Sequence, residues 1–274
     1  MRVLVTGGAG FIGSTLVDRL LAEGHEVDVI DDLSTGSLAN LAEARADRSH
    51  ELRFHHADIR LPDVAGLVGR RRPEVVFHLA AGSGEAPSVE AEVGVVGTLN
   101  VLEGARAGGA SKVVFASSHG GRSLHTTAKA AALEYLATYR ERFELEFTAL
   151  ALAAVYGPRQ RSGVVASFID RTSAGEACTI HGDGEQTRDF VYVDDVVDAF
   201  VRAGERGSGL VCDIGSGVET SINRLHSLIA GEPPVYQPPA APEPPRQPVD
   251  PTRAGMYLGW KPWTTLEAGL RAIT

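Results

Sequence analysis

Short apolar runs rich in β-branched residues alternate with longer amphipathic stretches through the first half of the chain. The runs predict strands over residues 3–6, 26–30, 52–57, 75–80 and 112–117. The stretches predict helices that begin near residue 12, pass through 99–105 and begin again near residue 127. Because the predicted strands are almost entirely apolar, we expect a parallel sheet with helices on both faces. The pattern therefore predicts an α/β fold with a doubly wound sheet.

The second half of the chain is less regular. Beyond about residue 154 we predict turns, a helix near 164–174, a glycine-rich hairpin at 182–184 and a strand that leads into a helix over 190–202. Nine of the 14 prolines fall between Gly231 and Pro251, which predicts an extended connection with neither helix nor sheet. We therefore expect one domain over 1–155, completed by parts of 190–215, and a smaller mixed α/β substrate-binding region over 156–274.

The composition restricts the partners of this 274-residue chain. Its 43% hydrophobic content supports a substantial core, and its net charge of −9 would repel nucleic acid. An anionic ligand would need local arginines and backbone N–H groups. Neither Cys178 nor Cys212 has metal-ligand spacing, and no apolar run reaches the length of a membrane span. We expect a cytoplasmic protein that binds neither nucleic acid nor membrane.

A glycine-rich turn joins the first predicted strand to the first predicted helix. Gly7 permits a tight turn, Gly10 removes a side chain that would block a pyrophosphate, and Gly13 allows the helix to pack closely on the strand. A glycine triplet by itself also fits an ordinary strand-to-helix loop. The strand before it, the helix after it and Asp31 at the end of the next strand together predict a Rossmann-type dinucleotide site.

Acidic residues after the second strand favour NAD over NADP. Asp31 can accept hydrogen bonds from the adenosine ribose, whereas a 2′-phosphate would face both Asp31 and Asp32. No arginine occurs in the next segment, residues 33–36. Asp58 follows the third strand, where it would either contact the adenine edge or remain a solvated carboxylate.

Several further motifs carry a family resemblance over nearly the whole chain. They are Thr6-Gly7-Gly8-Ala9-Gly10-Phe11-Ile12-Gly13, Asp31-Asp32-Leu33-Ser34-Thr35-Gly36, His78-Leu79-Ala80-Ala81, Gly97-Thr98-Leu99-Asn100-Val101-Leu102, Val114-Phe115-Ala116-Ser117-Ser118, Val155-Tyr156-Gly157-Pro158-Arg159-Gln160, the run from Gly182 to Asp195 and Leu258-Gly259-Trp260. With these motifs the chain resembles the extended short-chain dehydrogenase/reductase family, and within it the nucleotide-sugar epimerases and dehydratases (UDP-glucose 4-epimerase-like).

The resemblance implies a reaction in which NAD takes a hydride from a sugar carbon, usually C4, while a side chain removes the hydroxyl proton. Return of the hydride to the other face gives an epimer, and an intervening elimination gives a dehydrated sugar. In such enzymes a Tyr-x-x-x-Lys pair on one helix face supplies the base, and a nearby Ser or Thr binds the reacting oxygen. Ser118 and Lys129 match two of these positions. The cofactor contacts implied are Gly7, Gly10, Phe11, Ile12, Gly13, Asp31, Asp32, Ser34, Thr35, Gly36, Asp58, Ile59, Leu79, Ala80, Ala81, Ser117 and Lys129.

The chain departs from the family pattern at the tyrosine. Four residues before Lys129 stands His125, and the link from Ser118 to this helix is shorter than is usual in the family. A neutral imidazole is a competent base near pH 7, and the positive charges of Lys129 and NAD⁺ would keep it neutral. Imidazole reaches less far than phenol, so the alternative is a degenerate site. His119 is a second candidate acid or base, at a position where dehydratases of this family often carry a carboxylic acid.

Other family positions differ as well. Gly94 and Ala154 stand where the family usually has Asn, and Ala151 stands where it usually has Arg. Arg188 and Arg246 match the arginines that typically bind the substrate diphosphate, although either could form a surface ion pair instead. His55, His56 and Asp58 show no fourth ligand, so we predict no metal site.

These observations favour an NAD-dependent nucleotide-diphosphate-sugar 4-epimerase, acting by transient hydride transfer and forming a homodimer as many relatives do. A dehydratase or a keto-sugar reductase is the alternative within the same chemistry. The missing tyrosine and Ala154 leave open a third interpretation, a non-catalytic NAD-binding protein.

Overall fold

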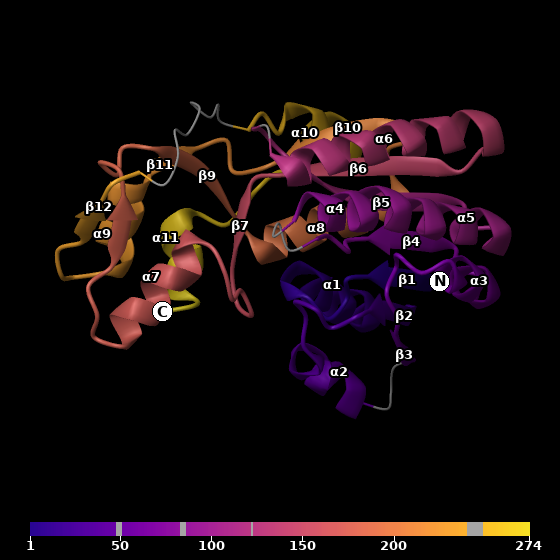
Figure 1. Cartoon of the computed structure of the whole chain (residues 1–274), viewed down its shortest axis with the longest axis horizontal. Helices are drawn as coiled ribbons and strands as arrows, with labels where there is room; N and C mark the ends of the chain where they lie inside the picture. Colours follow the sequence, from indigo (N-terminus) through magenta and orange to yellow (C-terminus); the bar gives the residue numbers. More distant parts are fainter. Residues whose placement is uncertain (48–50, 83–85, 122, 240–248) are drawn as a thin grey trace.

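The computed structural model describes residues 1–47, 51–82, 86–121, 123–239 and 249–274, which form a large and a small lobe (Figure 1). Seven parallel strands make the central sheet of the large lobe, in the order β10-β6-β5-β4-β1-β2-β3. They are β1 Arg2–Thr6, β2 Glu26–Asp31, β3 Leu52–His56, β4 Val75–His78, β5 Lys112–Ser118, β6 Glu146–Leu152 and β10 Leu210–Ile214. The strand order is that of a doubly wound dinucleotide-binding sheet. The predicted fold class is confirmed.

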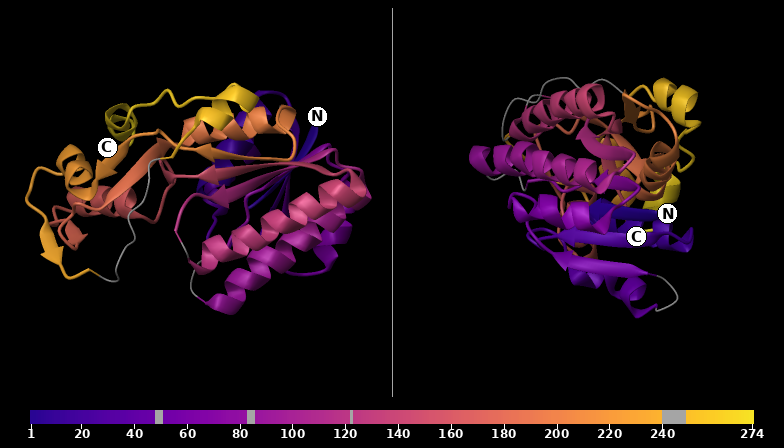
Figure 2. Two further views of the ribbon diagram at one scale, coloured as in Figure 1. Left: turned by 90° about the horizontal axis from the view of Figure 1, so that it is seen from above. Right: turned by 90° about the vertical axis from the view of Figure 1, so that its right-hand side faces the viewer.

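Helices cover both faces of this sheet (Figure 2). Those of the large lobe are α1 Phe11–Ala22, α2 Ala42–Ala46, α3 Asp63–Arg71, α4 Pro87–Ala91, α5 Thr98–Gly108, α6 Leu124–Phe143, α8 Val193–Glu205 and α10 Thr252–Leu258, with a 3₁₀-helix η1 Leu38–Leu41 and a π-helix η2 Glu92–Gly97. The helices α1, α8 and α10 share one buried core, and α3, α5 and α6 share the other. Among the described residues, no helix has the length and apolarity to span a bilayer.

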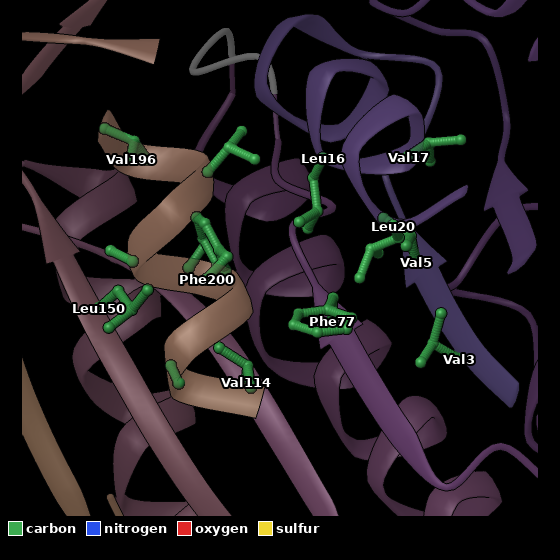
Figure 3. Packing of buried hydrophobic residues seen from close by; sticks show 14 of the residues in the cluster. Val3, Val5, Leu16, Val17, Leu20, Phe77, Val114, Leu150, Val196 and Phe200 are labelled. Carbon is green, nitrogen blue, oxygen red and sulfur yellow. The ribbon is translucent and has the colours of Figure 1, made fainter. Parts of the chain in front are cut away.

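The core under α1 and α8 fixes the position of the glycine-rich turn. Leu16 and Leu20 on α1 and Phe200 on α8 pack against Phe77 and Val114 of the sheet (Figure 3). These side chains are at most 2% exposed. Each contributes about 1.5–3 kcal/mol by burial. Because α1 also packs on β1 and β2, its amino end is held at the carboxyl edge of the sheet.

The small lobe has its own core and two small sheets. A three-stranded sheet has the order β11-β9-β7, and a parallel pair joins β12 to β8. Its elements are β7 Ala154–Tyr156, α7 Val164–Ser173, β8 Thr179–His181, β9 Thr187–Tyr192, β11 Glu219–Ser221, α9 Ile222–Ile229, β12 Val235–Gln237 and α11 Leu266–Arg271. Since β6 ends at Leu152 and β7 begins at Ala154, the small lobe starts at the carboxyl edge of the large sheet.

The structure corrects three local predictions. The hairpin at 182–184 is wrong, because β8 pairs with β12 and not with β9. The proline-rich segment was predicted to contain no sheet, but its residues 235–237 form β12. These residues lie between two proline pairs and are not prolines themselves, so their backbone N–H groups can pair with a neighbouring strand. The helix predicted from about residue 127 begins at Leu124, because Ser123 and Thr126 form a capping box there.

We propose that the domains divide as the sequence suggests, into 1–155 with parts of 190–215 and a smaller remainder. The core of the large lobe draws on α8 and β10, in agreement with this division. It also draws on Ala254 and Leu258 of α10 and on Trp260, whose Nε1 donates to the backbone oxygen of Asp195 at 2.7 Å. The sequence did not indicate this return of the chain to the large lobe.

Candidate active site

A cavity of about 450 Å³ opens at the carboxyl edge of the large sheet, above the glycine-rich turn. It is lined by most of the predicted cofactor contacts, namely Gly7, Gly10, Phe11, Ile12, Gly13, Asp31, Asp32, Ser34, Thr35, Asp58, Ile59, Leu79, Ala80 and Ala81. Gly36, Ser117 and Lys129 are not part of its lining. A Cβ at Gly36 would lie 3.1 Å from Oδ1 of Asp31, so Gly36 packs against the residues that shape the cavity.

The glycines of the turn are required by close backbone approaches. Gly7 has a φ of +69°, and a Cβ there would lie 2.8 Å from the nitrogen of Ala80. A Cβ at Gly13 would lie 2.1 Å from the oxygen of Gly7. Gly10 caps α1 without a side-chain hydrogen bond, so the first N–H groups of α1 remain available to an anion. This cradle fits the pyrophosphate of a dinucleotide.

Asp31 has a structural role beside the predicted one. Its side chain accepts hydrogen bonds from the backbone nitrogens of Ala9 at 2.9 Å and Leu33 at 2.8 Å, which fix the turn against β2. Burial raises the pKa of Asp31, and the two backbone hydrogen bonds counteract this shift. Contact with the ribose stays a prediction, in which Asp31 would share its carboxylate between the turn and the cofactor.

Arg60 is a cavity residue that the sequence argument missed. Its guanidinium binds both oxygens of Asp58, with Nη2 to Oδ2 at 2.6 Å, and lies 3.5 Å from Glu92. The side-chain hydrogen bond from Arg60 lowers the pKa of Asp58. Because Arg60 already pairs with Asp58 and Glu92, we expect it to bind a 2′-phosphate poorly. The sequence gives one sign of Arg60, because it stands two residues after Asp58, just beyond the third strand.

We expect the purified protein to bind NAD more tightly than NADP, and Asp32→Asn to reduce this preference. The change removes one negative charge, while Oδ1 of the asparagine can still accept from Ser34 as Oδ1 of Asp32 does. NADP affinity should rise about tenfold, which corresponds to about 1.4 kcal/mol. Isothermal titration with both cofactors measures this, with the exposed Asp63→Asn as the control. Equal NADP affinity in the two variants would contradict the charge argument.

His78 is fully buried and directly precedes Leu79, Ala80 and Ala81 of the cavity lining. Its Nδ1 lies 2.6 Å from Oγ1 of Thr6, and its Nε2 lies 2.9 Å from Oγ1 of Thr98. Because Thr98 donates its proton to the oxygen of Gly94, Nε2 of His78 must be the donor in that pair. Burial, and secondarily the charge of Lys129, lower the pKa of His78 to about 3. His78 is therefore a neutral structural residue that joins β1, β4 and α5.

Lys129 and His125 lie one turn apart on α6. Lys129 is 4% exposed, and its Nζ lies 3.4 Å from the oxygen of Ala80 and 4.6 Å from the ring centre of Phe115. Burial lowers the pKa of Lys129 to about 8, while the charge of Glu90 acts in the opposite direction. Since Ala80 lines the cavity, Lys129 contacts the wall of the dinucleotide region, although it is not part of the lining itself.

His125 is paired with a carboxylate that the sequence analysis did not identify. Its Nδ1 lies 3.1 Å from Oε2 of Glu90 on α4, whose side chain is 2% exposed. No motif marks Glu90, because the two residues are 35 positions apart and meet only when α4 packs on α6. The imidazole itself is partly accessible, with 33% of its side chain exposed.

The second histidine has a carboxylate partner of its own. Nδ1 of His119 lies 2.9 Å from Oδ1 of Asp213 on β10, and the backbone nitrogen of His119 donates to Leu152. Ser118 is half-buried at the end of β5. These residues and α6 therefore meet at the same edge of the sheet as the cavity.

A second cavity, of about 350 Å³, lies in the small lobe. Its lining includes Ala154, Ile180, Arg188 and Phe190. Arg188 donates to the oxygen of Thr187 at 2.7 Å. The structure thus brings together Arg188 and the altered position Ala154, whereas Arg246 lies outside the described residues. Ala151 is buried in β6 of the large sheet, 6% exposed, and does not line this cavity.

Known proteins resemble this chain over almost its full length. The model of the NAD dependent epimerase/dehydratase family matches residues 3–215. A UDP-glucose 4-epimerase of Mycolicibacterium smegmatis is 45% identical over 303 aligned positions, which cover 98% of this chain and 96% of that protein. The crystal structure of a UDP-glucose 4-epimerase from Thermotoga maritima, with UDP-glucose, is 36% identical and has a TM-score of 0.93 over 99% of this chain and 97% of that one.

A UDP-glucose 4-epimerase of Thermus thermophilus, solved as a complex with NAD, is 34% identical with a TM-score of 0.89, over 99% of this chain and 97% of that one. The glycine cradle, which fits a dinucleotide, agrees with the family match and with the neighbour that was solved with NAD. The chain belongs to the NAD dependent epimerase/dehydratase family of enzymes.

Proposed function

We propose that this protein is an NAD-dependent nucleotide-diphosphate-sugar 4-epimerase with His125 as its base. The observation that carries the proposal is the position of α6. It places the buried Lys129 against Ala80 of the dinucleotide cavity and the accessible His125 one turn away, at the same sheet edge as Ser118. The similarity to UDP-glucose 4-epimerases supports a UDP-sugar as the substrate.

Each residue has a distinct part in this proposal. Nε2 of His125 takes the hydroxyl proton from the sugar and later returns it, and Ser118 donates a hydrogen bond to the reacting oxygen. NAD, held by the glycine cradle, would supply reversible hydride transfer at the sugar carbon. Lys129 in its charged form would hold the cofactor ribose and favour negative charge on the reacting oxygen. Arg188, on the wall of the small-lobe cavity, would bind the diphosphate.

A specific observation favours a second candidate, a dehydratase. His119, which Asp213 holds at 2.9 Å, stands where family dehydratases often carry a carboxylic acid. An acid at this position would protonate the leaving hydroxyl during elimination of water.

One experiment separates these possibilities. The protein is incubated with NAD and a panel of UDP-, dTDP- and GDP-sugars, and products are separated by chromatography and mass. We expect a UDP-sugar to yield an isomer of equal mass. A product lighter by one water would replace the epimerase by the dehydratase. If no sugar is converted although NAD still binds, the interpretation as a non-catalytic NAD-binding protein would remain.

We further propose a cytoplasmic homodimer. Both cysteines are buried and free, which fits a reducing compartment. On α6, which packs beside α5, Leu124, Tyr135 and Phe143 are at least 40% exposed and could pair with a second copy. Light scattering at several concentrations measures the mass in solution.

A further inference from the structure

Glu90 is a carboxylate buried within the candidate active site. Its side chain is 2% exposed, and carboxylates are rarely buried so completely unless they are paired. Oε2 lies 3.1 Å from Nδ1 of His125, within hydrogen-bond distance. Glu90 also interacts electrostatically with Lys129, which follows His125 by four residues on α6. Its carboxylate therefore acts on both of the residues that we propose to move and stabilise charge.

Two glycines make the space for this contact. A Cβ on Gly82 would lie 2.4 Å from Oε1 of Glu90, so any larger residue would displace the carboxylate. A Cβ on Gly94 would lie 2.7 Å from the Cβ of Ala128, which shows that α6 packs directly on η2. An asparagine at position 94 would hold the helix away. Glycine at position 94 thus allows α6 to lie close to η2, which directly follows α4. The shorter reach of an imidazole is compatible with that approach.

A histidine that acts as a base becomes positively charged, and the groups of α6 around His125 also carry positive charge. His125 lies in the first turn of α6, where the backbone dipole favours negative charge. Lys129 adds a positive charge one helical turn away. A base in this position gains a proton during the reaction, so its charged form needs a counter-ion. Glu90 is the carboxylate that the structure places against it.

We infer that Glu90 is a positioning residue, which accepts Nδ1–H of His125 and thereby keeps the lone pair of Nε2 available for the sugar hydroxyl. The proton that leaves the hydroxyl oxygen forms a bond to Nε2, while Nδ1–H stays hydrogen-bonded to Glu90. The resulting imidazolium then lies beside a carboxylate until it returns the proton. This arrangement parallels that of a carboxylate and a histidine in a catalytic triad. The inference rests on the proposed function of His125 as the base.

The first test compares turnover in Glu90→Gln with that of the wild type. The amide occupies the same volume, but it is neutral and can present either oxygen or nitrogen to the imidazole. We expect kcat to fall about 10²-fold with KM unchanged within about threefold, because the proton transfer alone is affected. Glu134→Gln removes an exposed carboxylate from α6 and serves as the matched control. A kcat within about threefold of the wild type would overturn the inference.

The second test does not depend on activity. Nitrogen NMR of protein with labelled histidine reports the tautomer of each imidazole, and the signal missing from His125→Phe identifies His125. In the wild type without cofactor we expect the neutral ring to carry its proton on Nδ1. In Glu90→Gln this preference should weaken. A wild-type ring with its proton on Nε2 would overturn the inference, even if the glutamine variant failed to fold.

The failure of this inference can be told apart from failure of the proposed function. If His125→Phe abolishes turnover and Glu90→Gln does not change it, His125 remains the base and Glu90 has no positioning role. If His125→Phe leaves turnover unchanged, the base is wrongly assigned, and Glu90 cannot act through it.

Discussion

Replacing His125 by phenylalanine should reduce sugar turnover by about 10³-fold or more, with NAD affinity unchanged within about threefold. Phenylalanine fills the space of the imidazole but can neither take nor return a proton. His125 contacts Glu90 on α4 and is not part of the lining of the dinucleotide cavity, so cofactor binding should persist. Steady-state kinetics with the active UDP-sugar and isothermal titration with NAD measure the two effects separately.

His25→Phe is the matched control for this experiment. His25 directly precedes β2, at the amino edge of the sheet, opposite the candidate active site. Its replacement should leave both turnover and NAD affinity within about threefold of the wild type. Retention of turnover in His125→Phe would remove His125 from the mechanism and return attention to His119 and Asp213.

Replacing Lys129 by methionine should stabilise the fold and yet remove activity. Burial lowers the pKa of Lys129 to about 8, so at pH 7 the folded protein carries a costly charged ammonium. Its removal should raise the free energy of unfolding by about 1–3 kcal/mol, because one pKa unit corresponds to about 1.4 kcal/mol and the lost electrostatic attraction to Glu90 offsets part of the gain. Turnover should fall by about 10²-fold or more. Urea denaturation of the cofactor-free protein measures the stability.

The pH dependence provides a further check of Lys129. Its folded pKa of about 8 lies below the unfolded value of 10.5, so the unfolded chain binds more protons between these two values. The contribution of Lys129 to stability therefore rises as pH increases from about 8 toward 10.5, and the methionine variant should lack this rise. A lower stability of the variant at pH 7, or an unchanged pH slope, would contradict the argument.

Lys112→Met is the matched control for the titration. Burial also lowers the pKa of Lys112 to about 8, but this lysine lies at the amino end of β5, where it donates to the oxygens of Arg206 and Gly207. Its replacement should change the pH slope in the same direction and leave turnover within about threefold of the wild type. Loss of turnover in both variants would contradict a specific role of Lys129 in the active site.

The cofactor site was predictable because its requirements are local. Gly7 and Gly13 are six residues apart, and the limits on their side chains come from the backbone of the same turn and the strand beside it. The apolar runs likewise placed five of the seven strands of the central sheet, β1 to β5, within a few residues, since burial on both faces leaves few polar positions. The strands β6 and β10 were not predicted. Cofactor contact at the individual residues stays a prediction.

The small lobe was predicted less well. Its strands β7, β8, β11 and β12 have only three residues each, which is too short to show an alternation of polar and apolar positions. Their pairing joins segments far apart in sequence, as when Val235–Gln237 pairs with Thr179–His181. Such contacts depend on the packing of the complete lobe.

The sequence by itself determined the doubly wound sheet, the dinucleotide turn and the candidacy of His125, because each depends on residue types at short, fixed spacing. Only the tertiary structure decided what surrounds them. Glu90 meets His125, Asp213 meets His119, and Arg60 enters the cofactor cavity already bound to Asp58. The first two pairs join separate elements that packing alone brings together, and the protonation of a histidine depends on the charges within a few ångströms of it.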